Sequence, residues 1–380
     1  MIDPNFDVVV IGAGMAGLSV AAELSRNLRV AVIERESQPG YHATGRSAAL
    51  YSELYGNAVV RSLTRASRPF YFDTPEGFSG EALVAPRGSL FFGGPDEADA
   101  LDGFAALLGL QAGMKRLDAA AVEDLLPVFR PGYLTGGLYE TGSADIDVAA
   151  VLQGYAVQCR RRNVHLEVGG ALEGLERVGG RWQVRTRSAL LSASIVVNAA
   201  GAWGDELAAM AGVASIGLVP KRRTAILIEV PNGAVATHWP AAIHVNETFY
   251  FKPDAGLLLV SPADESPSAP CDAQPEELDI AIAVDRFETA SGASVRKIRS
   301  SWAGLRTFVA DKTPVVGFDA AAEGFFWLVG QGGYGIQMAP ALARAACELV
   351  QGKALPSDLA DEGLTASALV PNRPGVLGLA

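Results

Sequence analysis

Cysteine and histidine are both scarce in this chain. Among its 380 residues there are only three cysteines and four histidines. The cysteines, Cys159, Cys271 and Cys347, form no CxxC pair and show no spacing typical of a zinc site, so we expect no metal ion. A low cysteine count also favours a reducing compartment, and we expect the protein to be cytoplasmic.

Basic residues are in deficit. Lysine and arginine number 31 against 42 aspartates and glutamates, which gives a formal net charge of −11. Grooves for nucleic acid and surfaces for anionic membranes usually carry a basic excess, so neither partner is expected. An anionic substrate would have to be bound by local arginines.

Long hydrophobic runs are also missing. The chain begins MIDPNFDVVVIGAG, without a basic leader, and glycines interrupt this first apolar run too early for it to cross a bilayer. We therefore expect neither a signal peptide nor a transmembrane segment. With 49% hydrophobic and 19% charged residues, a chain of this length predicts a compact soluble protein with two domains.

What the chain does contain is three apolar strands, each followed by a glycine-rich turn and a helix. The first predicted strand spans residues 7–11, and after its helix a second strand over 29–33 ends at Glu34. Similar units begin at residues 194–198 and 325–329. Apolar strands that alternate with helices predict one parallel sheet, assembled here from distant segments.

The segments between these units show a different pattern. Alternating residues over 224–230, 248–252 and 257–260 predict an antiparallel or mixed sheet. The predicted class is therefore α/β with mixed α+β character, a Rossmann-like nucleotide-binding domain interleaved with a β-sheet substrate-binding domain. The first domain is assigned residues 1–75, 141–215 and 301–380, and the second residues 76–140 and 216–300.

The first glycine-rich turn has the pattern Gly12-x-Gly14-x-Ala16-Gly17. Gly12 permits a tight turn, Gly14 lets the backbone approach a pyrophosphate, and Gly17 lets the helix pack close to the strand. The helix N-terminus then faces the phosphates. Glu34, at the end of the second strand, can accept hydrogen bonds from the ribose hydroxyls of NAD or FAD, and the motif does not distinguish these two cofactors.

Six longer segments carry a resemblance to a known family. They are IERESQPGYHATGRSAALYSELYG, NAAGAWGDELA, PKRRTAILI, FYFKPDAGLLLVSPAD, WAGLRTFVADKTPVVG and EGFFWLVGQGGYGIQ. In this order they resemble the D-amino-acid oxidase-like flavoproteins, the superfamily of the glycine and sarcosine oxidases, over essentially the whole chain. Within that superfamily the chain is most similar to the bacterial FAD-dependent D-arginine dehydrogenases.

The resemblance implies an FAD-dependent enzyme. Such proteins bind one FAD in the Rossmann-like domain and an amino-acid substrate beneath a β-sheet cap. They transfer a hydride from Cα to flavin N5, and the imino acid that forms hydrolyses to a 2-oxo acid and ammonia. The electron acceptor, a quinone, a carrier protein or oxygen, stays open. A NAD-dependent dehydrogenase would not explain the GRSA loop, and a non-catalytic FAD protein would not need a carboxylate clamp.

The resemblance also implies which residues bind FAD. The loop after the second strand would wrap the pyrophosphate, the ribityl chain and the flavin ring, since small residues let the backbone approach a planar ring. The last glycine-rich turn would direct amides and a positive helix end at the flavin C2 carbonyl. The predicted FAD-binding residues are Gly12, Gly14, Ala16, Gly17, Glu34, Arg35, Thr44, Gly45, Arg46, Ser47, Ala48, Leu172, Gly332, Gly333, Tyr334, Gly335, Ile336 and Gln337.

Two arginines and two tyrosines match substrate-binding residues of the family. Arg306 and Arg223 would bind the substrate carboxylate, because a planar guanidinium stays charged and donates two parallel hydrogen bonds. Strand alternation lets only one of Arg222 and Arg223 face the cavity, and we predict that it is Arg223. Tyr250 would lie at the carboxylate and Tyr55 near the reacting carbon.

Two pocket positions depart from the D-arginine dehydrogenases. Leu50 stands where they carry a histidine, and Ser89 where they carry a glutamate that would pair with a cationic side chain. Loss of that partner predicts that D-arginine and D-lysine are poor substrates and that neutral or apolar D-amino acids are better. N-methyl amino acids and 2-hydroxy acids are the alternatives. Tyr334 and Gln337 are the remaining predicted pocket residues.

His42 raises the question of a covalent flavin. The related dimethylglycine dehydrogenases attach FAD to a histidine in a comparable loop. The GYHATGRSA form resembles the noncovalent enzymes, and no cysteine lies in the WAGLR segment as in the sarcosine oxidases. We therefore predict noncovalent FAD, with a link at His42 as the alternative.

Overall fold

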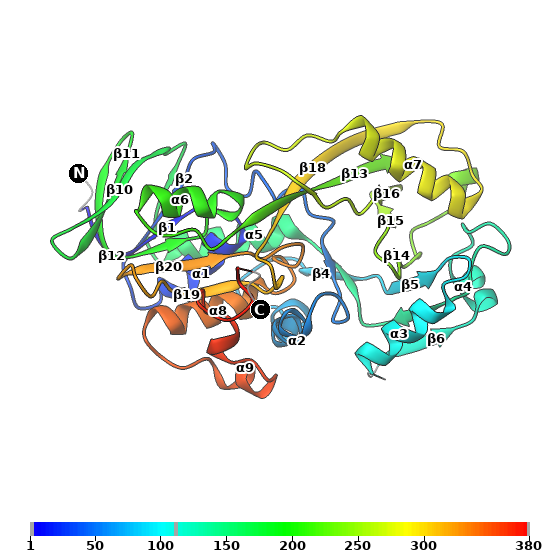
Figure 1. Ribbon diagram of the computed structural model, residues 1–380, viewed down its shortest axis with the longest axis horizontal. Helices are drawn as coiled ribbons and strands as arrows, with labels where there is room; N and C mark the ends of the chain where they lie inside the picture. The colour runs from blue at the N-terminus through cyan, green and yellow to red at the C-terminus, as the bar shows by residue number, and fades with distance from the viewer. Residues whose placement is uncertain (1–3, 110–112, 378–380) are drawn as a thin grey trace.

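Two large sheets lie beside one another along the long axis of the molecule (Figure 1). The computed structural model describes residues 4–109 and 113–377. The described residues do not include residues 1–3, 110–112 and 378–380. The predicted domain segments contain these residues, and the expectation about a basic leader concerns the first three. The predicted mixed α/β class is confirmed by the two sheets and their helices.

The first sheet is mainly parallel. Its strands are β1 (Asn5–Ile11), β2 (Val30–Glu34), β9 (His165–Val168), β10 (Leu172–Val178), β11 (Arg181–Thr186), β12 (Leu190–Asn198), β19 (Val315–Phe318) and β20 (Phe325–Val329). Strand β1 pairs in parallel with β2 and β12, and β12 pairs in parallel with β20. The three distant strand–turn–helix units therefore form one parallel sheet, as predicted.

Helices cover both faces of this sheet. The helices of this part of the molecule are α1 (Met15–Leu24), α2 (Ala58–Phe72), α5 (Val148–Arg161), α6 (Gly204–Met210), α8 (Ala339–Val350) and α9 (Ser357–Asp361), with the short turns η1 (Gly201–Trp203) and η3 (Ala366–Ala368). Alternate residues of β1 point to opposite faces, so Val8 and Val10 join α1, α5 and α8 in one core. Val9 and Ile11 join α6 in another. No helix within the described ranges combines the length and apolarity needed to cross a bilayer.

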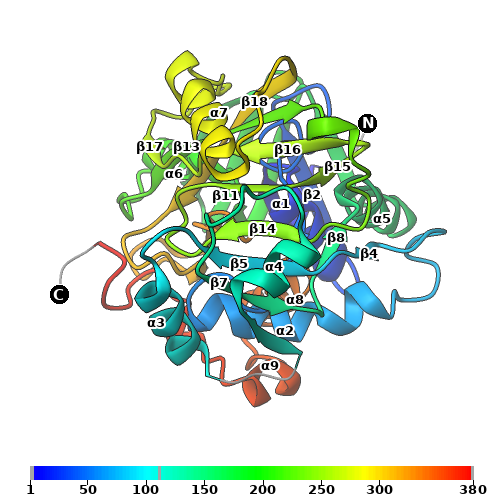
Figure 2. The ribbon, with the colours of Figure 1, turned by 90° about the vertical axis from the view of Figure 1, so that its right-hand side faces the viewer.

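The second sheet is mainly antiparallel. Its strands are β5 (Ser89–Gly93), β6 (Met114–Leu117), β7 (Gly136–Glu140), β13 (Val219–Ile228), β14 (Ala241–His244), β15 (Tyr250–Asp254), β16 (Leu257–Ser261), β17 (Ser266–Pro267) and β18 (Ile298–Phe308). Its other elements are α3 (Ala98–Leu108), α4 (Ala119–Leu125), α7 (Glu277–Ser291) and η2 (Pro231–Gly233). Helices α4 and α7 lie in front of the sheet in Figure 2, and a separate apolar core forms there with Ile226 and Phe251.

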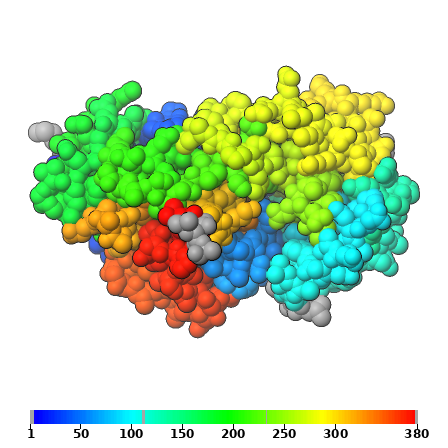
Figure 3. Space-filling view, viewed as in Figure 1, coloured from blue at the N-terminus to red at the C-terminus, as the bar shows by residue number. Residues whose placement is uncertain are grey.

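Strands β13 and β18 connect the two halves of the molecule. They pair along most of their length and run from the second sheet toward the first in Figure 1. Strand β18 begins at Ile298 and so crosses the predicted domain boundary between residues 300 and 301. A small sheet of β3 (Leu50–Tyr51), β4 (Val84–Pro86) and β8 (Ala144–Ile146) completes the fold. We call the first sheet with its helices the first half of the molecule, and the second sheet with its helices the second half. In Figure 3 the green and orange surface of the first half adjoins the yellow and cyan surface of the second half.

Candidate functional site

A long cavity with a volume of about 460 Å³ lies between the two sheets. The turns that follow β1, β2, β12 and β20 form one wall, and residues of β13, β15 and β18 form the other. Loops at the carboxyl ends of parallel strands are the usual ligand site of such sheets. The cavity lining therefore combines the two predicted binding regions, which come from distant parts of the sequence.

The first glycine-rich turn needs its glycines for close packing. Gly12 has φ +106°, and a Cβ there would lie 2.5 Å from the carbonyl oxygen of Ala199. A Cβ at Gly17 would lie 1.8 Å from the carbonyl oxygen of Gly12, so helix α1 can approach the turn only with glycine. The amide of Met15, which follows Gly14, donates a hydrogen bond to the Thr44 hydroxyl at 3.0 Å. Gly12, Gly14 and Ala16 line the cavity, whereas Gly17 supports the turn from behind.

Glu34 closes one end of the cavity. Its carboxylate accepts hydrogen bonds from the amides of Ala13 at 2.7 Å and Glu36 at 2.9 Å, which fix its orientation. Arg35 stacks its guanidinium on the ring of Trp203 at 3.9 Å. These residues and Leu172 line the cavity together, and their binding of adenosine stays a prediction.

His42 lies at this same end of the cavity. Its Nε2 is 2.9 Å from the Glu36 carboxylate, and its ring is 4.6 Å from that of Trp203. The hydrogen bond from His42 lowers the pKa of Glu36, against a smaller opposing effect of burial. The imidazole is thus engaged with Glu36 and Trp203, and it lines the cavity together with Glu34 and Arg35.

We expect acid precipitation of the holoenzyme to give a colourless pellet and a yellow supernatant. The reason is that the His42 imidazole is already engaged, through Nε2 with the Glu36 carboxylate and through its ring with Trp203. The measurement is the absorbance of pellet and supernatant near the flavin bands. A yellow pellet that turns colourless in a His42→Ala variant would establish a covalent link instead.

The loop from Thr44 to Ala48 follows β2 and lines the cavity except at Gly45. The Gly45 amide donates to the carbonyl of Gly40 at 2.8 Å, which tightens the loop. Arg46 donates to the carbonyls of Ala273 and Ala303, both at 2.9 Å, and also pairs with Asp272. The Arg46 side chain therefore attaches the loop to the second half of the molecule, a use that the sequence did not predict.

The last glycine-rich turn passes close to the second sheet. A Cβ at Gly332 would lie 2.2 Å from the Phe308 ring, and one at Gly333 would lie 2.7 Å from Nη1 of Arg306. Gly332, Gly333, Gly335 and Ile336 line the cavity. Helix α8 begins at Ala339, with Pro340 in its first turn as expected.

Tyr334 and Gln337 do not line the cavity, although both lie in this turn. Tyr334 packs its ring edge-on against Tyr55, with the centroids 4.8 Å apart. The Gln337 amide donates to the Thr64 hydroxyl at 2.9 Å and accepts from the Ser52 amide at 3.2 Å. The Gln337 side chain thus holds the turn to its neighbours, which corrects the expectation that it faces the substrate.

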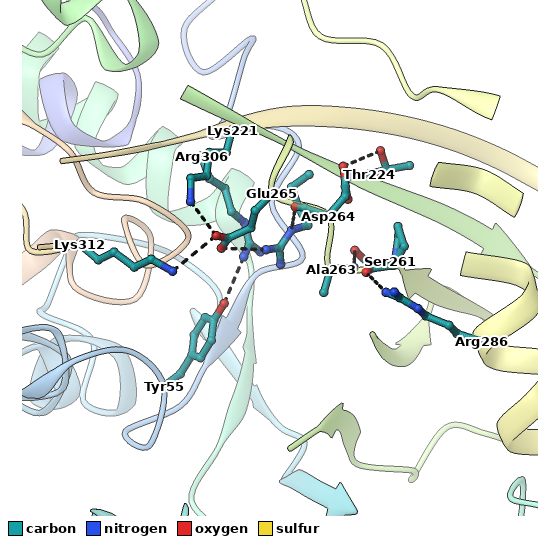
Figure 4. A network of polar contacts seen from close by, with 12 residues as sticks. Tyr55, Lys221, Thr224, Ser261, Ala263, Asp264, Glu265, Arg286, Arg306 and Lys312 are labelled. Carbon is teal, nitrogen blue, oxygen red and sulfur yellow. Dashed lines mark hydrogen bonds and ion pairs between the residues drawn. The ribbon is translucent and has the colours of Figure 1, made fainter. Parts of the chain in front are cut away.

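Arg306, Arg223 and Tyr250 line the other end of the cavity, whereas Tyr55, which was expected there, does not line it. In Figure 4 the Tyr55 hydroxyl points toward Arg306. Arg306 donates to the Tyr55 hydroxyl at 3.1 Å. Arg223, which is 8% exposed, faces the cavity as predicted and donates to the carbonyl of Asp264 at 2.8 Å. Arg222 does not line the cavity and pairs with Asp279 at 3.0 Å.

Two buried guanidinium groups, those of Arg306 and Arg223, lie in the wall at this end of the cavity. Burial would raise the pKa of Tyr250, but the charges of Arg306 and Arg223 outweigh it, so the pKa lies below the usual value of 10. Among the described residues, Arg306 has no carboxylate within ion-pair distance and makes its side-chain hydrogen bond to Tyr55. A buried guanidinium without a counter-ion favours binding of an anionic ligand group.

Leu50 and Ser89 do not line the cavity. Leu50 lies on β3 opposite Asp145, and the Ser89 hydroxyl is buried in a hydrogen bond with Ser143. Directly opposite Ser89 on β7 is Glu140, whose buried carboxylate accepts from the Ser52 hydroxyl at 2.6 Å. Burial raises the pKa of Glu140 to about 7, and the sequence did not indicate this residue. The expected position of Leu50 and Ser89 in the pocket wall is therefore not supported.

Other cavity residues were missed by reasoning from the sequence. The run 199–203, directly after β12, lines the cavity, as do Gly170, Met210 and Cys271. The position of 199–203 at the carboxyl end of a parallel strand could have identified it. The others lie near the cavity only because of the tertiary fold.

The glycine-rich turns, Glu34, Arg223 and Arg306 all line one cavity. The chain matches the family model described as FAD dependent oxidoreductase over residues 7–349. It belongs to this family, and FAD is its cofactor. When bound, FAD supplies an acceptor for a hydride, and the cavity described above has the residues to hold it.

Known proteins are similar over most of the chain. Glycine oxidase from Pseudomonas putida is 27% identical over 366 residues, covering 91% of this chain and 94% of the relative. The crystal structure of glycine oxidase from Geobacillus kaustophilus has a TM-score of 0.81 at 21% identity and covers 96% of this chain and 99% of its own. L-α-glycerophosphate oxidase from Mycoplasma pneumoniae with FAD bound also has a TM-score of 0.81, at 18% identity, with coverages of 91% and 95%.

Proposed function

We propose that this protein oxidises the Cα–N bond of D-amino acids with neutral or apolar side chains, using FAD. The observation that carries this proposal is the Arg306 guanidinium, which lines the cavity beside Gly333 and has no carboxylate partner among the described residues. The similarity to glycine oxidase supports an amino acid as the substrate. The D configuration rests on the resemblance in sequence.

Each side chain at the arginine end has a defined task in this proposal. Arg306 and Arg223 bind the substrate carboxylate, and their fixed forks orient Cα toward the last glycine-rich turn. Tyr55 holds Arg306 in place through its hydroxyl. Tyr250 presents its hydroxyl beside both arginines. No nucleophile is required, because the amino group has only to be neutral when the hydride leaves.

The FAD assignments remain predictions that the cavity supports. The pyrophosphate would lie against Gly12, Gly14 and Ala16, and the ribose would lie against Glu34. All four residues line the cavity. The backbone of the last glycine-rich turn would lie along the flavin ring. Water at the cavity mouth would then hydrolyse the imino acid to a 2-oxo acid and ammonia.

We expect neutral D-amino acids to be oxidised with a kcat/KM about tenfold or more above that of D-arginine. The physical reason is that the Arg306 guanidinium, which lines the cavity and has no carboxylate partner among the described residues, would repel a cationic side chain. The measurement is anaerobic bleaching of the flavin, followed by steady-state rates with an artificial acceptor.

The substrate panel includes L-amino acids as the matched control, together with N-methyl amino acids and 2-hydroxy acids. Highest specificity for D-arginine would contradict the side-chain prediction. Bleaching only by an N-methyl amino acid or a 2-hydroxy acid would replace the proposed bond with one of the two alternatives. Admission of air after bleaching distinguishes oxygen from other electron acceptors.

A further inference from the structure

The Glu265 carboxylate contacts three cationic side chains. Figure 4 shows it with two of them, Lys221 and Lys312. Its oxygens lie 2.9 Å from Nζ of Lys221, 3.4 Å from Nζ of Lys312 and 3.4 Å from Nη2 of Arg223. Burial alone would raise the pKa of Glu265, but these three cations lower it, so the group is ionised at neutral pH. Arg223 therefore already has an anionic partner, in contrast to Arg306.

The cluster extends from solvent to the cavity wall. The Lys312 side chain is 49% exposed, those of Glu265 and Lys221 are 30% and 23% exposed, and that of Arg223 is 8% exposed and lines the cavity. Both lysines also lie near the Phe308 ring, which packs against the last glycine-rich turn. An incoming carboxylate that reaches Arg223 thus enters a position already facing the Glu265 carboxylate.

We propose that Glu265 is a specificity-determining residue that competes with the substrate carboxylate for Arg223. This inference rests on the proposed function, in which Arg223 and Arg306 bind that carboxylate. Glu265 neutralises Arg223, so Arg306 makes the stronger contact with a monocarboxylate. A second carboxylate on the substrate side chain would be repelled by Glu265, which makes dicarboxylic amino acids poor substrates.

The proposal predicts opposite changes in carboxylate affinity when the charge of Glu265 and the charge of Lys312 are removed. A purely structural role of Glu265 would not predict this opposition. Loss of the Glu265 charge leaves Arg223 and both lysines without their shared counter-ion, so carboxylates should bind more tightly. Loss of the Lys312 charge removes one competitor for Glu265, which strengthens the contact between Glu265 and Arg223. Carboxylates should then bind more weakly.

The test measures the dissociation constants of acetate and benzoate from the FAD-loaded enzyme by the change in flavin absorbance. For Glu265→Gln we expect about a tenfold decrease in both constants and about a tenfold rise in the kcat/KM of D-glutamate relative to D-alanine. For Lys312→Met we expect an increase in both constants. The charge-matched control is Glu229→Gln, which removes a carboxylate paired with Arg299 outside the cavity. It should change neither the two dissociation constants nor the relative kcat/KM of D-glutamate.

The outcomes separate this inference from the function on which it rests. If neither acetate nor benzoate perturbs the flavin of the wild-type enzyme, the proposed carboxylate site itself fails. If they bind to wild type and the constants for Glu265→Gln are unchanged or larger, the role of Glu265 is overturned. Should Glu265→Gln lose FAD or unfold, the sign of the Lys312→Met effect decides, since a decrease or no change there also overturns the proposal.

Discussion

An Arg306→Ala variant is expected to lose about three orders of magnitude in kcat/KM while keeping its FAD. Removing one partner of a buried charge pair costs roughly 2–5 kcal/mol, and 1.4 kcal/mol corresponds to a factor of ten. Arg306 lines the cavity beside Gly333 and has no carboxylate partner within the described ranges, so its charge is available to the substrate. The measurement is kcat/KM for the best substrate of the panel.

The control for this variant lies on the same strand. Arg299 of β18 pairs with Glu229 on the exposed surface, and Arg299→Ala should leave kcat/KM within about twofold because exposed ion pairs contribute little. Arg306→Lys should recover part of the activity, since it keeps the charge and loses the planar fork. Unchanged kcat/KM in Arg306→Ala, with normal flavin content, would contradict the assignment of Arg306.

Gly12→Ala is expected to abolish FAD binding and to destabilise the fold by about 2 kcal/mol or more. Two independent features are responsible. Gly12 has φ +106°, which is strained for alanine, and the new Cβ would lie 2.5 Å from the carbonyl oxygen of Ala199 at the end of β12. The turn must then move away from β12 and from the cavity that it lines. Flavin content after purification and the midpoint of thermal unfolding measure both effects.

A second glycine provides the matched control. Gly103 lies inside helix α3, and a Cβ there would meet no atom within 4 Å. Gly103→Ala should therefore retain full flavin content and gain up to about 1 kcal/mol in stability from the better helix propensity of alanine. Full flavin content and an unchanged unfolding midpoint in Gly12→Ala would show that the turn has more room than its geometry indicates.

Sequence patterns predicted the central elements well because those elements are locally determined. The apolar run 325–329 coincides with β20, and the predicted strand at 29–33 matches β2, which spans Val30–Glu34. The boundaries in the second sheet were less accurate, since β15 begins at Tyr250, two residues after the predicted start. Strand ends depend on pairing partners that lie far away in the sequence.

The candidate site was predicted where a motif or strand alternation constrains a side chain. The alternation of β13 predicted that only one of two neighbouring arginines faces the cavity, and Arg223 lines it whereas Arg222 pairs with Asp279. Among the positions carried over from the resemblance, Arg46 and Arg306 line the cavity. The Gln337 side chain does not, since it is engaged with Thr64 and Ser52.

The sequence by itself determined the cofactor-binding half of this protein, because glycine spacing, apolar runs and Glu34 act within one local strand–turn–helix unit. Only the tertiary structure decided how charges meet at the other end of the cavity. Glu265 lies beside Arg223 and Lys312, and Arg306 beside Tyr55 and Gly333, through strand pairing and loop packing between distant segments. Such contacts depend on distances of a few ångströms, and no local pattern encodes these distances between residues that are 27 to 251 positions apart in the chain.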